Sequence, residues 1–161
     1  MKRVYLSLGS NLGDRQENLN RALGALRREH IHVVAQSSVY ETEPQEVVQQ
    51  PWFLNLAVEC ETQYFPVQLL GVVERIEREL GRERGPGAVQ RGPRVIDIDV
   101  LLFGNLVMAT PQLTVPHSRM LERRFVLEPL LEIAPDLRHP GTREPLSKYL
   151  RKVEGQKVRR A

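Results

Sequence analysis

The chain has 161 residues, 41% of them hydrophobic, and a formal net charge of +3. This is the size and composition of one domain with its own core, so we expect residues 1–161 to form a single domain. A single cysteine excludes a disulfide framework. The sequence contains no run of about 18 apolar residues, the length needed to cross a membrane, and its first residues lack a signal-peptide pattern. We therefore expect a cytoplasmic protein.

The spacing of hydrophobic residues predicts two successive strand, helix, strand units. Alternation predicts the strands, and helical spacing with typical start residues predicts the helices, which begin near Asp14 and Pro66. The order is typical of an α+β fold, a ferredoxin-like antiparallel sheet with helices packed on one face. The predicted elements are a strand ending at Gly9, a helix from Asp14 to about residue 29, a strand at 31–39, a strand at 53–62, a helix at 66–81 with Glu77 off its buried stripe, and a strand at 95–103.

The rest of the chain predicts smaller additions to this unit. We expect a short hairpin from residues 106–108 and 113–115, and then two C-terminal helices at 125–133 and 145–153. Residues 41–51 combine two prolines with little periodicity and predict a surface loop. Residues 156–161 predict a frayed basic tail.

Two carboxylates lie inside the strand predicted at 95–103. Side chains alternate along a strand, so Asp97 and Asp99 share one face, roughly 6.7 Å apart. That gap suits one or two Mg²⁺ ions, which take oxygen ligands at about 2.1 Å and commonly share them with phosphates. The alternative is an acidic strand face that is simply solvated.

The segment just before this strand is basic and rich in turn-forming residues. Between Arg82 and Arg94 there are four arginines and one acid, Glu83, together with three glycines and two prolines. Such a composition predicts irregular structure, and its length favours a functional loop. Arginine beside an Asp pair suits phosphate transfer, because a guanidinium can contact phosphates while cations bridge them. The alternative is a solvated basic loop.

A possible ring-binding pair lies on the strand predicted at 53–62. Phe53 and Asn55 share the face opposite Leu54, Leu56, Val58 and Cys60, which we expect to be core residues. An aromatic ring can stack on a flat heterocycle while an amide bonds its edge. Without other support, a solvated face is the simpler interpretation.

Together these features resemble the 6-hydroxymethyl-7,8-dihydropterin pyrophosphokinase family of folate biosynthesis. The resemblance covers nearly the whole chain, and it is specific because seven short motifs occur in register. The motifs are Leu8-Gly9-Ser10-Asn11-Leu12-Gly13, Tyr40-Glu41-Thr42-Glu43-Pro44, Phe53-Leu54-Asn55, Glu77 with Gly81-Arg82, Gly92-Pro93-Arg94-Val95-Ile96-Asp97-Ile98-Asp99, Leu113-Thr114-Val115-Pro116-His117 and Arg123-Arg124-Phe125.

The resemblance implies an ATP-dependent diphosphokinase that transfers pyrophosphate to the pterin hydroxymethyl group and releases AMP. It implies two Mg²⁺ ions at Asp97 and Asp99, with Arg82 and Arg94 on the triphosphate as further catalytic residues. The other implied ATP-binding residues are Glu77, Arg84, Ile98, Thr114, His117 and Arg123. The implied pterin-binding residues are Thr42, Phe53, Asn55 and Phe125.

One residue departs from the family pattern. Members often carry Trp before Gly-Pro-Arg, whereas this chain has Arg91. An arginine can still cover a ring face with its planar guanidinium.

Two other functions fit parts of the pattern. An RNA-binding ferredoxin-like module would suit the basic net charge, but Phe53 is the one candidate stacking residue found on a strand face, and such a module has no need of Asp97 and Asp99. An unrelated Mg²⁺-dependent nucleotidyl or phosphoryl transferase would release ADP or pyrophosphate instead of AMP. We expect small-molecule substrates, no nucleic-acid or membrane partner, and a monomer.

Overall fold

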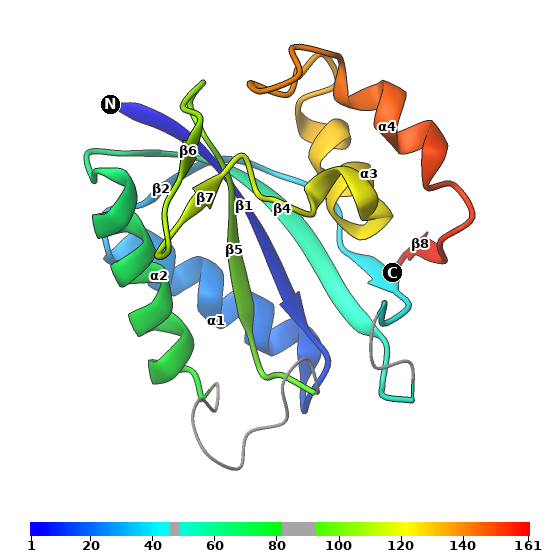
Figure 1. Cartoon of the computed structure of the whole chain (residues 1–161). Coiled ribbons are helices and arrows are strands. Elements are labelled where there is room, and N and C mark those ends of the chain that lie inside the picture. The colour runs from blue at the N-terminus through cyan, green and yellow to red at the C-terminus, as the bar shows by residue number, and fades with distance from the viewer. Residues whose placement is uncertain (46–48, 82–92) are drawn as a thin grey trace.

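The fold is built on one antiparallel sheet, shown in Figure 1. The computed structural model describes residues 1–45, 49–81 and 93–161. Within these residues the sheet has the order β5-β1-β4-β3-β8, and β2 also pairs with β4. The elements are β1 Lys2–Ser10, α1 Arg15–Arg28, β2 His32–Gln36, β3 Tyr40–Thr42, β4 Phe53–Thr62, α2 Pro66–Glu79, β5 Asp97–Phe103, β6 Met108–Ala109, β7 Thr114–Val115, the 3₁₀ helix η1 Met120–Glu122, α3 Arg124–Ile133, α4 Leu146–Lys152 and β8 Val158–Arg160.

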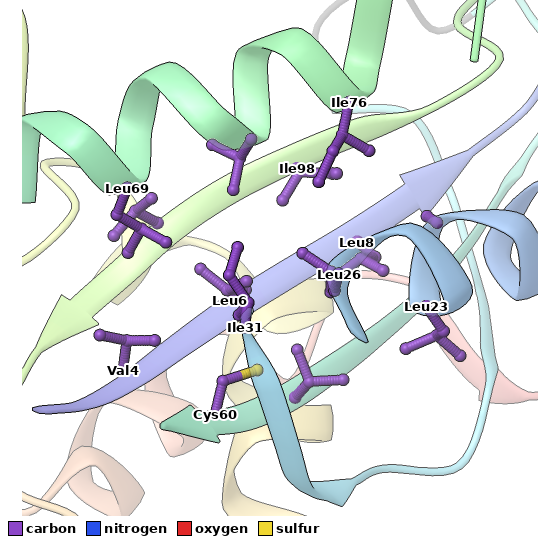
Figure 2. Close-up of a cluster of buried hydrophobic side chains, with 14 of the residues drawn as sticks. Val4, Leu6, Leu8, Leu23, Leu26, Ile31, Cys60, Leu69, Ile76 and Ile98 are labelled. Carbon is purple, nitrogen blue, oxygen red and sulfur yellow. The ribbon is translucent and has the colours of Figure 1, made fainter. Parts of the chain in front are cut away.

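Helices α1 and α2 cover one face of the sheet. The Asp14 carboxylate accepts a hydrogen bond of 3.1 Å from the Glu17 N–H and so begins α1, as predicted. Pro66 begins α2, where the Phe65 N–H donates to the Gln68 side chain at 2.8 Å. Figure 2 shows the core between these helices and the strands, including Leu6, Leu26, Leu69 and Ile98. This layer confirms the predicted α+β sheet with helices on one face.

The C-terminal helices α3 and α4 cover part of the opposite face (Figure 1). Their core joins the sheet residues Tyr5, Ala57 and Leu101 to helix residues that include Leu127 and Leu146. Helix α3 packs on β4, so the middle of β4 is buried on both faces. The remaining part of this face carries the polar residues described below.

Two predicted boundaries are wrong: the strand predicted at 31–39 ends earlier, and the loop predicted at 41–51 begins with residues that belong to a strand. Strand β2 stops at Gln36, and Tyr40–Thr42 form a separate strand, β3, which also pairs with β4. The break occurs because the Ser38 N–H and hydroxyl turn away from the sheet and donate to Glu132 at 2.8 and 3.0 Å.

The predicted frayed tail is also wrong. Residues Val158–Arg160 form β8, which pairs antiparallel with β3. The pairing supplies hydrogen-bond partners to the edge of β3, and the Ala161 N–H extends it by donating to the Val39 carbonyl at 2.9 Å. The C-terminus therefore adds a strand to the sheet.

Cys60 lies in the core, as predicted, and its burial raises the pKa of its thiol to about 12. At pH 8 we expect native protein to react with a thiol reagent such as Ellman's reagent at least about 100-fold more slowly than unfolded protein, because the thiolate is the reactive form. The single cysteine makes the measurement direct, with protein in denaturant as the control. Rapid modification of native protein would contradict this placement.

Across the described ranges, no helix is long and apolar enough to span a lipid bilayer.

Candidate active site

The two carboxylates lie on β5, at the edge of the sheet. Strand β1 pairs with β5 so that Gly9 faces Asp97 and Ser7 faces Asp99. Both aspartates are partly buried, and the Asp97 side chain is only 20% exposed. This face is therefore partly enclosed. The alternative interpretation had supposed a freely solvated face.

Glu77 fixes the outer edge of β5 between the two aspartates. Its carboxylate accepts a buried hydrogen bond of 2.8 Å from the Ile98 N–H. Glu77 is only 1% exposed, so the sequence-based placement of this residue off the buried stripe of α2 is wrong. Burial is possible because the edge of β5 presents a backbone donor that the carboxylate can satisfy.

Arg94 connects the carboxylates to the predicted ring-binding pair. Its guanidinium donates to Asp97 Oδ2 at 3.1 Å, and its Cζ lies 5.4 Å from the centre of the Phe53 ring. Asn11, which is buried, accepts from the Arg94 N–H at 2.7 Å and donates its own N–H to the Arg94 carbonyl at 3.0 Å. The turn after β1 thus holds Arg94 in place, a role that sequence reasoning missed.

Asn55 lies in the same cross-strand row as Asp97, with Gly9 between them. It is 3% exposed, and among the described residues its Oδ1 has no hydrogen-bond partner. A Cβ at Gly9 would lie 3.1 Å from that oxygen, so glycine makes room for the amide. A buried amide oxygen without a protein partner is well suited to a ligand N–H.

The remaining pterin-side candidates lie on two strands and a helix. Thr42 is buried on β3, directly opposite Phe53 on β4. Phe125 lies in the first turn of α3, and the Arg123 Cζ is 5.4 Å from the centre of its ring.

Among the nucleotide-side candidates, His117 bonds the backbone of β5. The His117 N–H donates to the Leu101 carbonyl at 2.9 Å, and His117 Nδ1 accepts from the Arg119 N–H at 3.1 Å. Burial, reinforced by the Arg123 guanidinium, lowers the pKa of His117 to about 4 although Asp97 acts in the opposite direction. The imidazole is therefore neutral at pH 7, with its proton on Nε2. Thr114 is exposed on β7.

The predicted Arg82 and Arg84, and the atypical Arg91, lie outside the described residues, so their place in the site stays a prediction. Across the described part of the chain, no group of three or more His, Cys, Asp or Glu side chains could hold a metal by itself. The hard oxygen donors of Asp97 and Asp99 fit Mg²⁺ when phosphate and water supply the other ligands.

Sequence reasoning also missed a charged cluster beside the pterin-side strands. Arg15 donates to Glu41 at 3.0 Å and to the Trp52 carbonyl at 2.9 Å. Glu41 also accepts from Arg159 at 3.1 Å. Hydrogen bonds from Arg159 and Arg15 lower the pKa of the Glu41 carboxyl. Residues this far apart in sequence left no local pattern that would have predicted the cluster.

Comparisons with known proteins place the chain in a family. Residues 5–135 match the family model described as 7,8-dihydro-6-hydroxymethylpterin-pyrophosphokinase. The chain is 46% identical over 141 residues to the 2-amino-4-hydroxy-6-hydroxymethyldihydropteridine pyrophosphokinase of Bacillus subtilis, covering 86% of this chain and 82% of that protein. It is 43% identical over 159 residues to the folic acid synthesis protein fol1 of Schizosaccharomyces pombe, covering 98% of this chain.

The fold also matches solved structures. The wild-type HPPK-DHPS of Plasmodium falciparum with pteroate aligns with a TM-score of 0.74 at 16% identity, over 94% of this chain and 42% of that one. The fungal and plant relatives are much longer, since this chain spans 21% of the S. pombe protein and 25% of the pea folate synthesis bifunctional protein.

Proposed function

The chain belongs to the 7,8-dihydro-6-hydroxymethylpterin-pyrophosphokinase family, and from that premise we propose that it transfers pyrophosphate from ATP to the hydroxymethyl group of 6-hydroxymethyl-7,8-dihydropterin. The hydroxyl oxygen attacks the β-phosphorus, the bond from that phosphorus to the oxygen of the α-phosphate breaks, and AMP leaves. The hydroxyl proton is released.

The observation that carries this proposal is the position of Arg94. It bonds Asp97 and also lies over Phe53, so groups suited to phosphate and groups suited to a ring are adjacent. A transfer from a nucleotide to a pterin needs these two kinds of group side by side, because the reacting oxygen and phosphorus must meet in line.

The proposal includes two Mg²⁺ ions held by Asp97 and Asp99. Bound there, the metal neutralises phosphate charge and orients the transferred group. Arg94, predicted together with Arg82 and Arg84 to contact the triphosphate, supplies positive charge from the protein. Neutral His117 keeps Nε2–H available to donate to a phosphate oxygen, next to Arg123, while Glu77 and Ile98 fix the strand between the two carboxylates.

On the pterin side, the chain's residues bind and orient the ring. Phe53 and Phe125 supply aromatic faces, and Asn55 Oδ1, which has no partner among the described residues, can accept from a ring N–H. Thr42 lies beside Phe53 in the register of β3 and β4. We propose ATP and the pterin as the substrates. We also propose that the protein is a monomer in the cytoplasm, and light scattering during gel filtration tests its oligomeric state.

The test is a nucleotide product assay with ATP, Mg²⁺ and 6-hydroxymethyl-7,8-dihydropterin. We expect AMP only when pterin and metal are both present. ADP or free pyrophosphate would instead indicate another phosphoryl or nucleotidyl transferase. No turnover of any kind, combined with tight RNA binding, would favour the RNA-binding alternative, which neither the family match nor the acidic sheet face supports.

Asn55→Ala is expected to weaken pterin binding without weakening the fold. The substitution removes a buried oxygen that has no partner among the described residues, and leaving such a group unpaired costs about 1–3 kcal/mol, which offsets the lost packing. We expect the KM for pterin to rise about tenfold or more, with thermal stability within about 1 kcal/mol of wild type. An unchanged KM for pterin would remove Asn55 from the binding site.

A further inference from the structure

The C-terminal segment 154–161 contacts both sides of the candidate pterin site. The family model match ends at residue 135, so this segment lies beyond the matched region. We propose that it is a positioning element that holds the two sides of the pterin site at a fixed separation. The proposal rests on the proposed function, because it names what positions that same site.

The first attachment is to the strand side of the site. In β8, Val158 pairs with Thr42 and Arg159 with Glu41. One residue earlier, the Lys157 carbonyl accepts from the Glu43 N–H at 3.1 Å. Thr42 in turn pairs with Phe53 on β4. Strand β8 therefore supports the outer edge of the strand pair that carries Thr42 and Phe53.

The second attachment is to Trp52, the residue before Phe53. The Arg159 Cζ lies 5.1 Å from the centre of the Trp52 ring, and the same guanidinium donates to Glu41 at 3.1 Å. The Arg15 guanidinium donates a hydrogen bond to the Trp52 carbonyl at 2.9 Å. The Arg159 side chain is 68% exposed, so its ion pair alone contributes little stability, and its value lies in orienting Trp52.

The third attachment is to the helix side. Gln156 Oε1 accepts from the Arg124 N–H at 2.8 Å, and Gln156 Nε2 donates to the Glu122 carbonyl at 2.7 Å. The Arg124 guanidinium donates to the carbonyls of Glu154 and Gln156 at 3.0 and 2.8 Å. These bonds fix the backbone at residues 122–124, directly before Phe125.

These attachments connect Phe53 and Phe125 through one short segment. In Figure 1, β8 lies beside β3 at the outer edge of the sheet, near the end where β4 begins, and α3 packs on β4 and β3. Ring stacking depends steeply on the separation of the two faces, so a connection that fixes this separation acts on pterin affinity more than on nucleotide affinity.

Two variants test the proposal: deletion of residues 158–161, which removes β8, and Gln156→Ala, which removes both amide bonds. For each we expect the KM for pterin to rise about five- to tenfold, while kcat and the KM for ATP change less than about twofold. Lys157→Ala is the matched control, because it alters an exposed neighbour but keeps the carbonyl that bonds Glu43. Its kinetics should equal those of wild type.

The emission of Trp52, the single tryptophan, gives a second readout that does not depend on turnover. The deletion should shift this emission, and Lys157→Ala should not. If the protein that lacks residues 158–161 does not fold, the kinetics of Gln156→Ala alone test the positioning role. Equal increases in both KM values, or no change in either variant, would overturn the positioning role. Absence of AMP formation by wild type would instead overturn the proposed function, while Trp52 emission would still report the contact with β8.

Discussion

Replacing Asp97 or Asp99 with alanine is expected to lower kcat for AMP formation by at least about a thousandfold. Positioning and charge neutralisation provide most of the rate in phosphoryl transfer, and these two carboxylates are the hard oxygen donors on the site face of β5. The fold should persist, because both side chains are only partly buried and neither belongs to the hydrophobic core.

The control for this experiment is Asp136→Ala, which removes an exposed carboxylate after α3. Asp97→Asn and Asp99→Asn keep the side-chain shape but remove the charge, so they should lose nearly as much activity as the alanine variants. Calorimetry of Mg²⁺ binding with a non-hydrolysable ATP analogue gives a readout besides activity, and each variant should bind less metal. Full turnover in either alanine variant would refute the metal assignment.

The central fold could be predicted because each of its long elements carries its own periodicity. Strand β4 and the start of α1 occur where alternation and the Asp14 cap predicted them. Strands β3 and β8 have three residues each, too few to show a period, and each is stabilised by pairing with a distant strand. Local patterns therefore predicted a loop and a frayed tail in their place.

The candidate site shows the same division between local and distant information. The shared face of Asp97 and Asp99 follows from alternation within one strand. The row of Asp97, Gly9 and Asn55 depends on register across three strands, and the bond between Asn11 and Arg94 joins residues 83 positions apart. Alternation singled out Asp97 and Asn55, the family resemblance assigned their roles, and the structure supplied the contact between Arg94 and Phe53.

Glu77→Ala is expected to lower the free energy of unfolding by about 1–3 kcal/mol, because it leaves the buried Ile98 N–H without its acceptor. We also expect kcat to fall, since Ile98 lies between Asp97 and Asp99 and its backbone bond sets the path of the strand that presents them. The measurements are urea unfolding followed by Trp52 emission, and initial rates of AMP formation at saturating substrates.

Glu77→Gln separates the hydrogen bond from the charge. The amide oxygen of glutamine can still accept from Ile98, so stability should stay within about 1 kcal/mol of wild type and above that of Glu77→Ala. Glu79→Gln, whose side chain is 59% exposed on the same helix, is the position control. If alanine and glutamine at position 77 destabilise equally, the carboxylate acts through its charge, and the edge of β5 does not depend on this bond.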